Sequence, residues 1–335
     1  MKTVANADFG SHESMHLNHN RAVLTMLLVT LMWSTAGMVT RHLEFARSFE
    51  VTFWRSWFAF LSLLVILLVQ RGRGAFTAIL QGGKTFWLSA LCWCGMFTFF
   101  MLALTTTTVA NVLVILAAGP LVTAVMAWVS IGHRPPLRTW LTIVVAGGGI
   151  VWMFAGQTGS INWLGAILAM GVPISGAINW TLTQRAHADA QADAHANAHA
   201  QADSHNADQG KVQPNTQPDL VPAVMVGGLL SSLITLPMAM PFQSTLHDVG
   251  LLAGLGLVQL AIPCMLAVLC AKHLPAPEVS LLALLEVIFG IALAWVGAGE
   301  TPQPAVLTGG AVVLAAMAFN ELVGWRSRNA AARSE

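Results

Sequence analysis

Charged side chains are scarce in this sequence of 335 residues. Only 9% of its residues are Asp, Glu, Lys or Arg, whereas a soluble globular domain carries about 25%. Hydrophobic residues make up 56% of the chain, and the mean hydropathy is +0.67. So few charges exclude a soluble fold, because they cannot cover that much apolar surface. The composition therefore predicts an all-α integral membrane protein surrounded by hydrocarbon.

Other functional signals are also missing. A net charge of +1 argues against a nucleic-acid partner, which needs a basic patch. All four cysteines fall within apolar runs, which indicates small buried hydrophobes rather than a disulfide framework or a metal site. The sequence contains no Ser-His-Asp set, phosphate-binding loop or nucleotide motif. We therefore expect no enzyme activity, no ATP hydrolysis and no cofactor.

Ten segments are long and apolar enough to cross a membrane as helices, which takes about 20 residues. They are residues 22–40, 51–70, 86–104, 109–131, 138–155, 163–183, 220–240, 249–271, 279–298 and 303–324. If the N-terminus is inside, the inner segments hold thirteen Lys and Arg residues and the outer loops hold two. Because positive residues are enriched on the cytoplasmic side, we expect the tails 1–21 and 325–335 to be cytoplasmic.

Two similar stretches indicate an internal repeat. AWVSIGHRP at 127–135 and AWVGAGETP at 294–302 end the fourth and the ninth predicted spans. They divide the chain into one five-helix half at 22–155 and another at 163–324. Because five is odd, the second half enters the membrane in the opposite sense. Such inverted-topology repeats are typical of secondary transporters, whose substrate site lies near the midplane between the repeats.

The order of several motifs resembles the EamA branch of the drug/metabolite transporter superfamily over about residues 22–324. The motifs are LMWSTAGMVTR at 31–41, FWRSWFAFLSLL at 53–64, AILAMGVPISGAINWTLTQR at 166–185 and LCAKHLPAPEVSLLALLEVIFGIALAWVGAGE at 269–300. Arg55 and Glu286 match an Arg and a common acid of the family, whereas Gly132-His133 replaces its usual Gly-Glu. The resemblance implies a transporter of the bacterial inner membrane that exports amino acids, metabolites or drugs by exchange with ions or protons.

Glu286 lies in the middle of an apolar span. An ionisable group within a span costs about 2.5–3.5 kcal/mol on insertion scales and indicates a functional site. A rise of about 1.5 Å per residue places Glu286 near the bilayer midplane. We interpret it as the carrier of a coupling proton or as the partner of a cationic group on the substrate. The structural alternative is a protonated Glu bonded to a neighbouring helix.

Arg55 is a second ionisable side chain within a span. It either binds a substrate carboxylate or extends to the interface as an anchor. We expect Arg55 and Glu286 at different depths and predict no ion pair between them, and we expect Glu50 to be solvated. Small polar and aromatic groups are candidates for the cavity wall, although such polar groups often link helices instead. They are Trp33, Ser34, Thr35, Asn111, Ser175, Asn179 and Trp180.

Residues 186–219 interrupt the second half with a low-complexity segment in which Ala alternates with Asp, Gln, His and Asn. Such a composition cannot bury a core, so we expect a disordered cytoplasmic linker. The alternative is a metal site, because His195 and His199 would share one face of a helix and hold Zn or Ni. We favour the linker, because a compositional segment carries no fixed geometry.

The sequence as a whole predicts a secondary transporter whose halves give alternating access to a midplane cavity. Its expected partners are a small-molecule substrate and the lipid bilayer, and homodimerisation is left open. Two other classes stay as alternatives, a polytopic membrane enzyme that acts on lipid and a membrane sensor that reads a metal through its His-rich loop.

Overall fold

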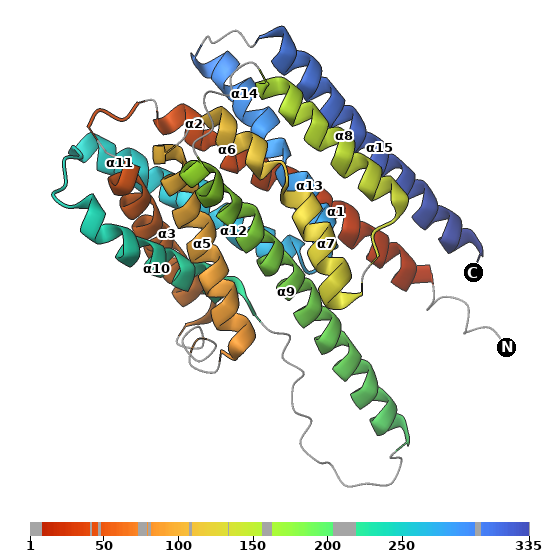
Figure 1. Ribbon diagram of the computed structural model, residues 1–335. Helices are drawn as coiled ribbons and strands as arrows, with labels where there is room; N and C mark the ends of the chain where they lie inside the picture. Colours follow the sequence, from red (N-terminus) through yellow and green to blue (C-terminus); the bar gives the residue numbers. More distant parts are fainter. Residues whose placement is uncertain are drawn as a thin grey trace.

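The computed structural model describes residues 9–40, 42–45, 48–72, 79, 82–106, 109–132, 134–155, 163–203, 219–298 and 303–334. Helix accounts for 88% of the structure, and no strand occurs in these ranges. The helices pack into one bundle, from which the end of the long helix Trp163–Asp203 projects (Figure 1). The predicted all-α fold is confirmed.

Seven helices lie in the described ranges of the first part of the chain. They are α1 (Phe9–Trp33), α2 (Thr35–Thr40), α3 (Ser48–Arg71), α5 (Lys84–Thr106), α6 (Val109–Leu116), α7 (Gly119–Ile131) and α8 (Leu137–Phe154). The second part contains seven α-helices and one π-helical turn. They are α9 (Trp163–Asp203), α10 (Val221–Ala239), α11 (Leu246–Leu255), the π-turn η1 (Gly256–Ala261), α12 (Ile262–Cys270), α13 (Ala276–Ala283), α14 (Leu285–Ala298) and α15 (Pro304–Ser334).

Eight helical segments in the described ranges are long and apolar enough to cross a membrane. They are Phe49–Gln70, Lys84–Ala103, Val114–Ile131, Trp163–Ala192, Val221–Ala239, Leu246–Cys270, Ala276–Leu293 and Pro304–Gly324. Each overlaps one of the ten predicted spans. Of the other two predictions, 138–155 falls on the shorter apolar helix α8, and 22–40 falls on α1 and α2. A multi-span membrane protein is confirmed, and the count of ten stays a prediction.

Two spans are broken at matching places. Ala117 and Ala118 separate α6 from α7, and Leu284 separates α13 from α14. Adding 167 to the residue numbers of the first and last residues of α6 gives the first and last residues of α13. The same addition converts the first residue of α8 into the first residue of α15. In the first half Pro120 explains the break, because proline lacks the N–H that a continuous helix would bond to the preceding turn. The same 167-residue shift relates AWVSIGHRP to AWVGAGETP.

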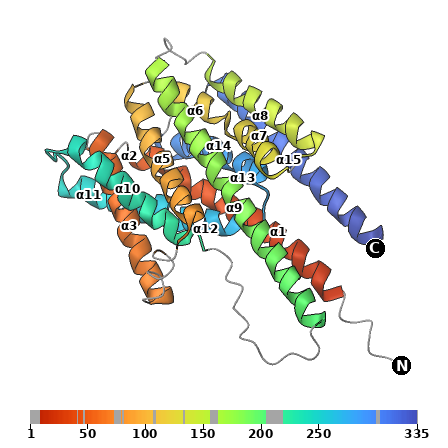
Figure 2. The ribbon, with the colours of Figure 1, turned by 60° about the horizontal axis from the view of Figure 1, so that its bottom comes forward.

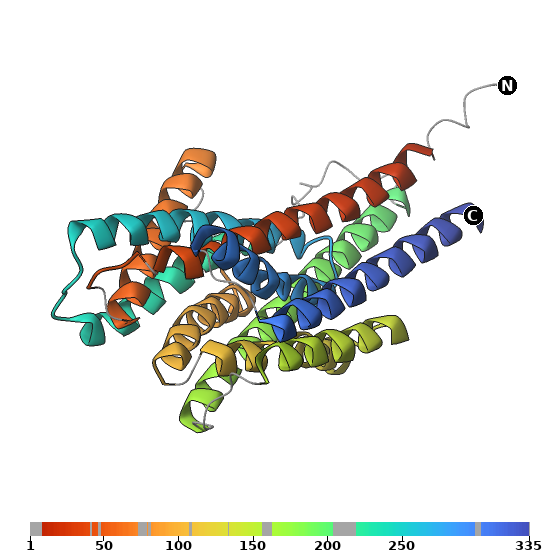
Figure 3. The same ribbon diagram turned by 90° about the horizontal axis from the view of Figure 1, so that it is seen from above.

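The helices α8 and α15 pack side by side in opposite directions (Figure 3). Near the end of α8, Trp152 Nε1 donates a hydrogen bond of 3.1 Å to Thr308 Oγ1, near the start of α15. Near the start of α8, Thr139 Oγ1 donates to Asn320 Oδ1 at 3.4 Å, farther along α15. This pair of helices is therefore antiparallel.

Glu50, in the first turn of α3, is fully buried. Its Oε1 accepts hydrogen bonds from the backbone N–H of Gln243 at 2.6 Å and from the N–H and hydroxyl of Ser244, both at 3.1 Å. The prediction that Glu50 is solvated is wrong, because the segment between α10 and α11 covers the carboxylate and supplies its donors.

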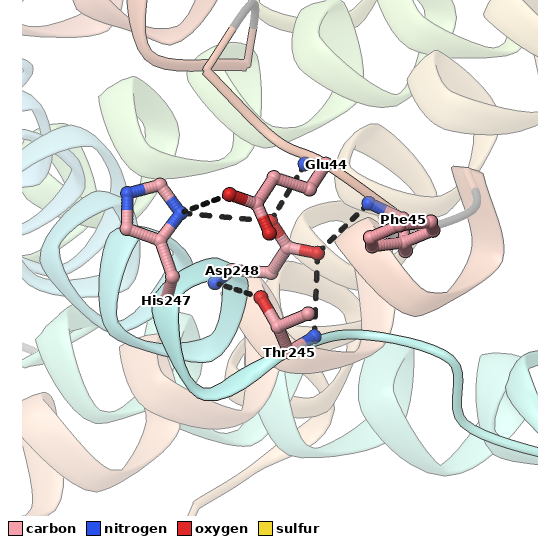
Figure 4. Close-up of polar contacts among 5 residues, drawn as sticks. All are labelled: Glu44, Phe45, Thr245, His247 and Asp248. Carbon is pink, nitrogen blue, oxygen red and sulfur yellow. Dashed lines mark hydrogen bonds and ion pairs between the residues drawn. The ribbon is translucent and has the colours of Figure 1, made fainter.

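Asp248 is a second fully buried carboxylate. It accepts hydrogen bonds from the N–H groups of Glu44 at 2.8 Å, Phe45 at 3.0 Å and Thr245 at 3.4 Å (Figure 4). Thr245 Oγ1 in turn accepts a hydrogen bond from the N–H of Asp248, which completes a capping box at the start of α11. These bonds join the segment between α2 and α3 to the second part of the chain.

The helix α9 continues well past the apolar span (Figure 2). A disordered linker over 186–219 is therefore wrong for 186–203, which are helical. The physical reason is the high helix propensity of alternating alanines. His195 and His199 lie on this helix, but their side chains, like residues 204–218, fall outside the described part. Where side chains are described, no group of three or more His, Cys, Asp or Glu is arranged to hold a metal ion.

Candidate functional site

A cavity of about 190 Å³ lies at the centre of the bundle. The first half of the chain contributes walls from α1, α3, α5, α6 and α7, and the second half from α9, η1, α12, α13 and α14. Most of the lining is apolar. Five aromatic side chains stand in it, namely Trp33, Trp93, Phe97, Phe100 and Trp180.

The aromatic side chains form a packed wall. Trp93 and Trp180 meet edge to face, with their ring centroids 5.6 Å apart and their planes at 89°. Phe97 lies beside Trp93 with a centroid distance of 5.7 Å. Edge-to-face pairs are a favourable geometry for aromatic rings. A mostly apolar wall with few polar groups is typical of small-molecule sites.

Arg55 and Glu286 both line this cavity. Arg55 is only 4% exposed, and its Nε is buried without a hydrogen-bond partner. The two side chains interact electrostatically, yet no hydrogen bond or ion pair between them occurs in the described part of the chain. The structure places Arg55 in the cavity wall with Glu286, and the different membrane depths expected for the two residues stay a prediction. A buried charge without close partners is costly, so this cavity provides binding groups for a polar ligand.

The break between α13 and α14 positions Glu286. It places the carboxylate in the first turn of α14, where the helix dipole favours negative charge. In α7, the matching helix of the first half, Pro120 also lines the cavity. Discontinuous helices that meet near the midplane are typical of binding sites in secondary transporters.

The other side chains expected at the site fall into two groups. Trp33 and Trp180 line the cavity. Ser34, which lies between α1 and α2, instead donates to the carbonyl of Leu31 in α1 at 2.6 Å. Thr35 Oγ1 likewise donates to a carbonyl of the preceding turn.

Ser175 and Asn179 act at the interface between α9 and α5. Ser175 lies against Gly95 of α5, and Asn179 Oδ1 accepts a hydrogen bond of 2.7 Å from Ser89 Oγ. Neither lines the cavity, so the helix-linking alternative describes their position. Asn111 belongs to α6, and its side chain is outside the described part.

Sequence reasoning missed several lining residues, of which Gln259 is the most polar. Gln259 belongs to the π-turn η1, and π-turns are frequent at functional sites. Gln259 is the one amide in the apolar run 249–271, and this signal identifies it from the sequence alone. Trp93 and Phe97 carried no such signal, because aromatic residues are common in any span.

The described part of the chain combines helices long and apolar enough to cross a membrane with a cavity lined by charged side chains. Residues 20–155 match the model of the EamA-like transporter family. This match confirms the resemblance to the EamA branch of the drug/metabolite transporter superfamily over residues 20–155. The chain is thus a multi-pass membrane protein.

Solved structures show the same fold. Among 26 matching chains, one described as "Crystal structure of protein" has a TM-score of 0.68 and 13% sequence identity, and the match covers 91% of this chain and 98% of that chain. At this identity the likeness establishes the fold alone. No curated protein matches the chain.

Proposed function

We propose that the protein is a secondary active transporter that moves a small amphiphilic molecule by alternating access to the central cavity. The observation that carries the proposal is the presence of buried Arg55 and half-buried Glu286 in one aromatic cavity between the halves. Glu286 carries a coupling proton or binds a cationic group of the substrate. Arg55 binds an anionic group, and the Trp side chains cover the apolar body.

The proposed architecture is ten membrane-spanning helices in two inverted five-helix halves, at 22–155 and 163–324. The 167-residue shift between broken helices supports it. So does the antiparallel pairing of α8 with α15, because equivalent helices of inverted repeats run in opposite directions. Each chain encloses its own cavity, so the proposal holds for a single chain or a homodimer.

The proposed location is the inner membrane of a bacterial cell. In the proposed orientation, both tails, 1–21 and 325–335, and the segment 186–219 lie in the cytoplasm. The start of α1, the end of α9 and the end of α15 lie at one end of the molecule (Figures 1 and 2). The excess of Lys and Arg in the inner segments supports the cytoplasmic assignment of that end.

Topology reporters at the two ends of the chain test this orientation. We expect alkaline phosphatase to be inactive and green fluorescent protein to be fluorescent when fused after Glu335 or inserted before Phe9. A fusion between α10 and α11, at Pro241, serves as the matched outer position and is expected to give the reverse pattern. Opposite results for the two chain ends would disprove the even number of spans.

The direction of transport in this proposal is export, with amino acids, metabolites or drugs as substrates and protons or a counter-substrate for coupling. L-Leucine is a suitable first probe, since it combines a carboxylate, an ammonium group and an apolar body. Vesicles with purified protein should accumulate labelled L-leucine when a pH gradient is imposed, and protein-free vesicles should not. Turnover of lipid without solute movement would instead favour the polytopic membrane enzyme.

A further inference from the structure

Gln259 is held at the cavity wall by a single hydrogen bond. Its Nε2 donates to the carbonyl of Trp33 at 3.4 Å, and that carbonyl lies where α1 ends, before α2 begins. The bond also fixes the orientation of the amide, because the reversed amide would place two acceptor oxygens against each other. The side chain is only 5% exposed.

The other end of this amide is unsatisfied. Gln259 Oε1 is buried and has no hydrogen-bond partner among the described residues, although Gln259 belongs to the cavity lining. Buried polar atoms are nearly always paired, and an acceptor left without a donor costs free energy. A ligand in the cavity that carries a donor group would supply the missing bond.

Apart from the Ser280 hydroxyl of the second half, which can donate or accept, the buried donors of the cavity wall that lack a partner in the described part belong to the first half and the acceptors to the second. The buried donor atoms without partners, Arg55 Nε and Trp93 Nε1, belong to α3 and α5 in the first half. The acceptors, Gln259 Oε1 and the Glu286 carboxylate, belong to η1 and α14 in the second half. A ligand with an acidic group at one end and a donor at the other therefore connects the two halves.

We propose that Gln259 is a specificity-determining binding residue whose Oε1 accepts a hydrogen bond from the ammonium or other N–H donor of the ligand. The acidic group of the same ligand binds Arg55 of α3, the helix that packs against η1. This inference rests on the proposed transport function and adds to it that Gln259 recognises the donor group of the ligand.

Three related probes isolate the two ends of the ligand. L-Leucine has both groups, 3-methylbutylamine lacks the carboxylate, and 4-methylpentanoate lacks the ammonium group. We expect Gln259→Leu in the purified full-length protein to weaken L-leucine and 3-methylbutylamine about tenfold or more, since a hydrogen bond to a charged group is lost. Binding of 4-methylpentanoate should not change. Calorimetry measures all three affinities.

Gln259→Glu provides the conservative test, because it keeps an acceptor at the same position. We expect it to bind 3-methylbutylamine at least as tightly as the unchanged protein does. It also serves if Gln259→Leu does not fold. Gln184→Leu is the matched control, since the Gln184 amide oxygen already accepts a hydrogen bond from the N–H of Ala276 at 2.9 Å. It should leave the relative affinities unchanged.

Equal weakening of all three probes by Gln259→Leu would show a structural role through the Trp33 carbonyl and overturn the inference. Unchanged affinities would overturn it as well. Either result leaves the transport proposal standing when vesicles still accumulate L-leucine. If the unchanged protein binds none of the three probes, the ligand chemistry itself is wrong and the inference falls with it.

Discussion

Glu286→Gln is expected to reduce the accumulation of labelled L-leucine driven by a pH gradient by at least about tenfold. A tenfold change corresponds to a free energy of about 1.4 kcal/mol. Gln has nearly the same shape as Glu but takes up no proton. The residue lies in the first turn of α14 at the wall of the cavity, so the change alters the site without altering the packing. Uptake into vesicles over a series of imposed pH gradients provides the measurement.

Exchange of labelled for unlabelled L-leucine separates the two roles considered for Glu286. Exchange continues in Glu286→Gln if the acid carries only the coupling proton, and it stops if the acid binds the ammonium group. Glu44→Gln is the matched control, because Glu44 is about half exposed and lies outside the cavity. Gradient-driven accumulation equal to that of the unchanged protein would remove both roles.

Gly256→Val is expected to lower the free energy of unfolding by about 3 kcal/mol or more, in the range of severe overpacking. Gly256 begins η1 and lies against α3. A Cβ atom there would stand 2.6 Å from Phe58 Cβ and 2.9 Å from both Ala59 N and Arg55 O. The backbone of α3 therefore has to move, and Arg55 moves with it. Thermal unfolding in detergent measures the loss.

Gly254→Ala is the control for this change, because a Cβ at Gly254 meets no atom within 4 Å. We expect it to keep the stability of the unchanged protein or to increase it slightly, since alanine is the better helix former. A Gly256→Val protein that unfolds at the same temperature as Gly254→Ala would show that η1 and α3 are not packed as described.

The sequence was sufficient to predict the eight candidate spans of the described part, because about 20 apolar residues cross a bilayer whatever their neighbours are. Length along a helix was less informative for the site. Counting residues from their own helix ends predicts different depths for Arg55 and Glu286, and this counting does not indicate that they share a cavity. Their shared cavity depends on how α3 and α14 pack, which no local pattern specifies.

The polar residues near the helix ends were predicted least well. Glu50 was expected to be solvated because it lies beside a loop, yet it is fully buried, as is Asp248, whose burial no sequence pattern predicted. Their donors come from segments about 200 residues away in the sequence. Ser175 and Asn179 were assigned to the cavity, whereas they face α5, because several positions on a uniformly apolar helix are equally plausible as its inner face.

The paired interruptions in α6–α7 and α13–α14 have a mechanical consequence. Bending a helix at a break disturbs few backbone hydrogen bonds. Each of these spans therefore has a flexible joint at its break, between two rigid helical segments. The joints are neighbours, since Gly119 of α7 lies against Ser280 of α13. Bending at one joint therefore displaces the helices on either side of the other joint. The bundle is able to reshape its interior at these two joints while the long outer pair, α8 and α15, stays packed.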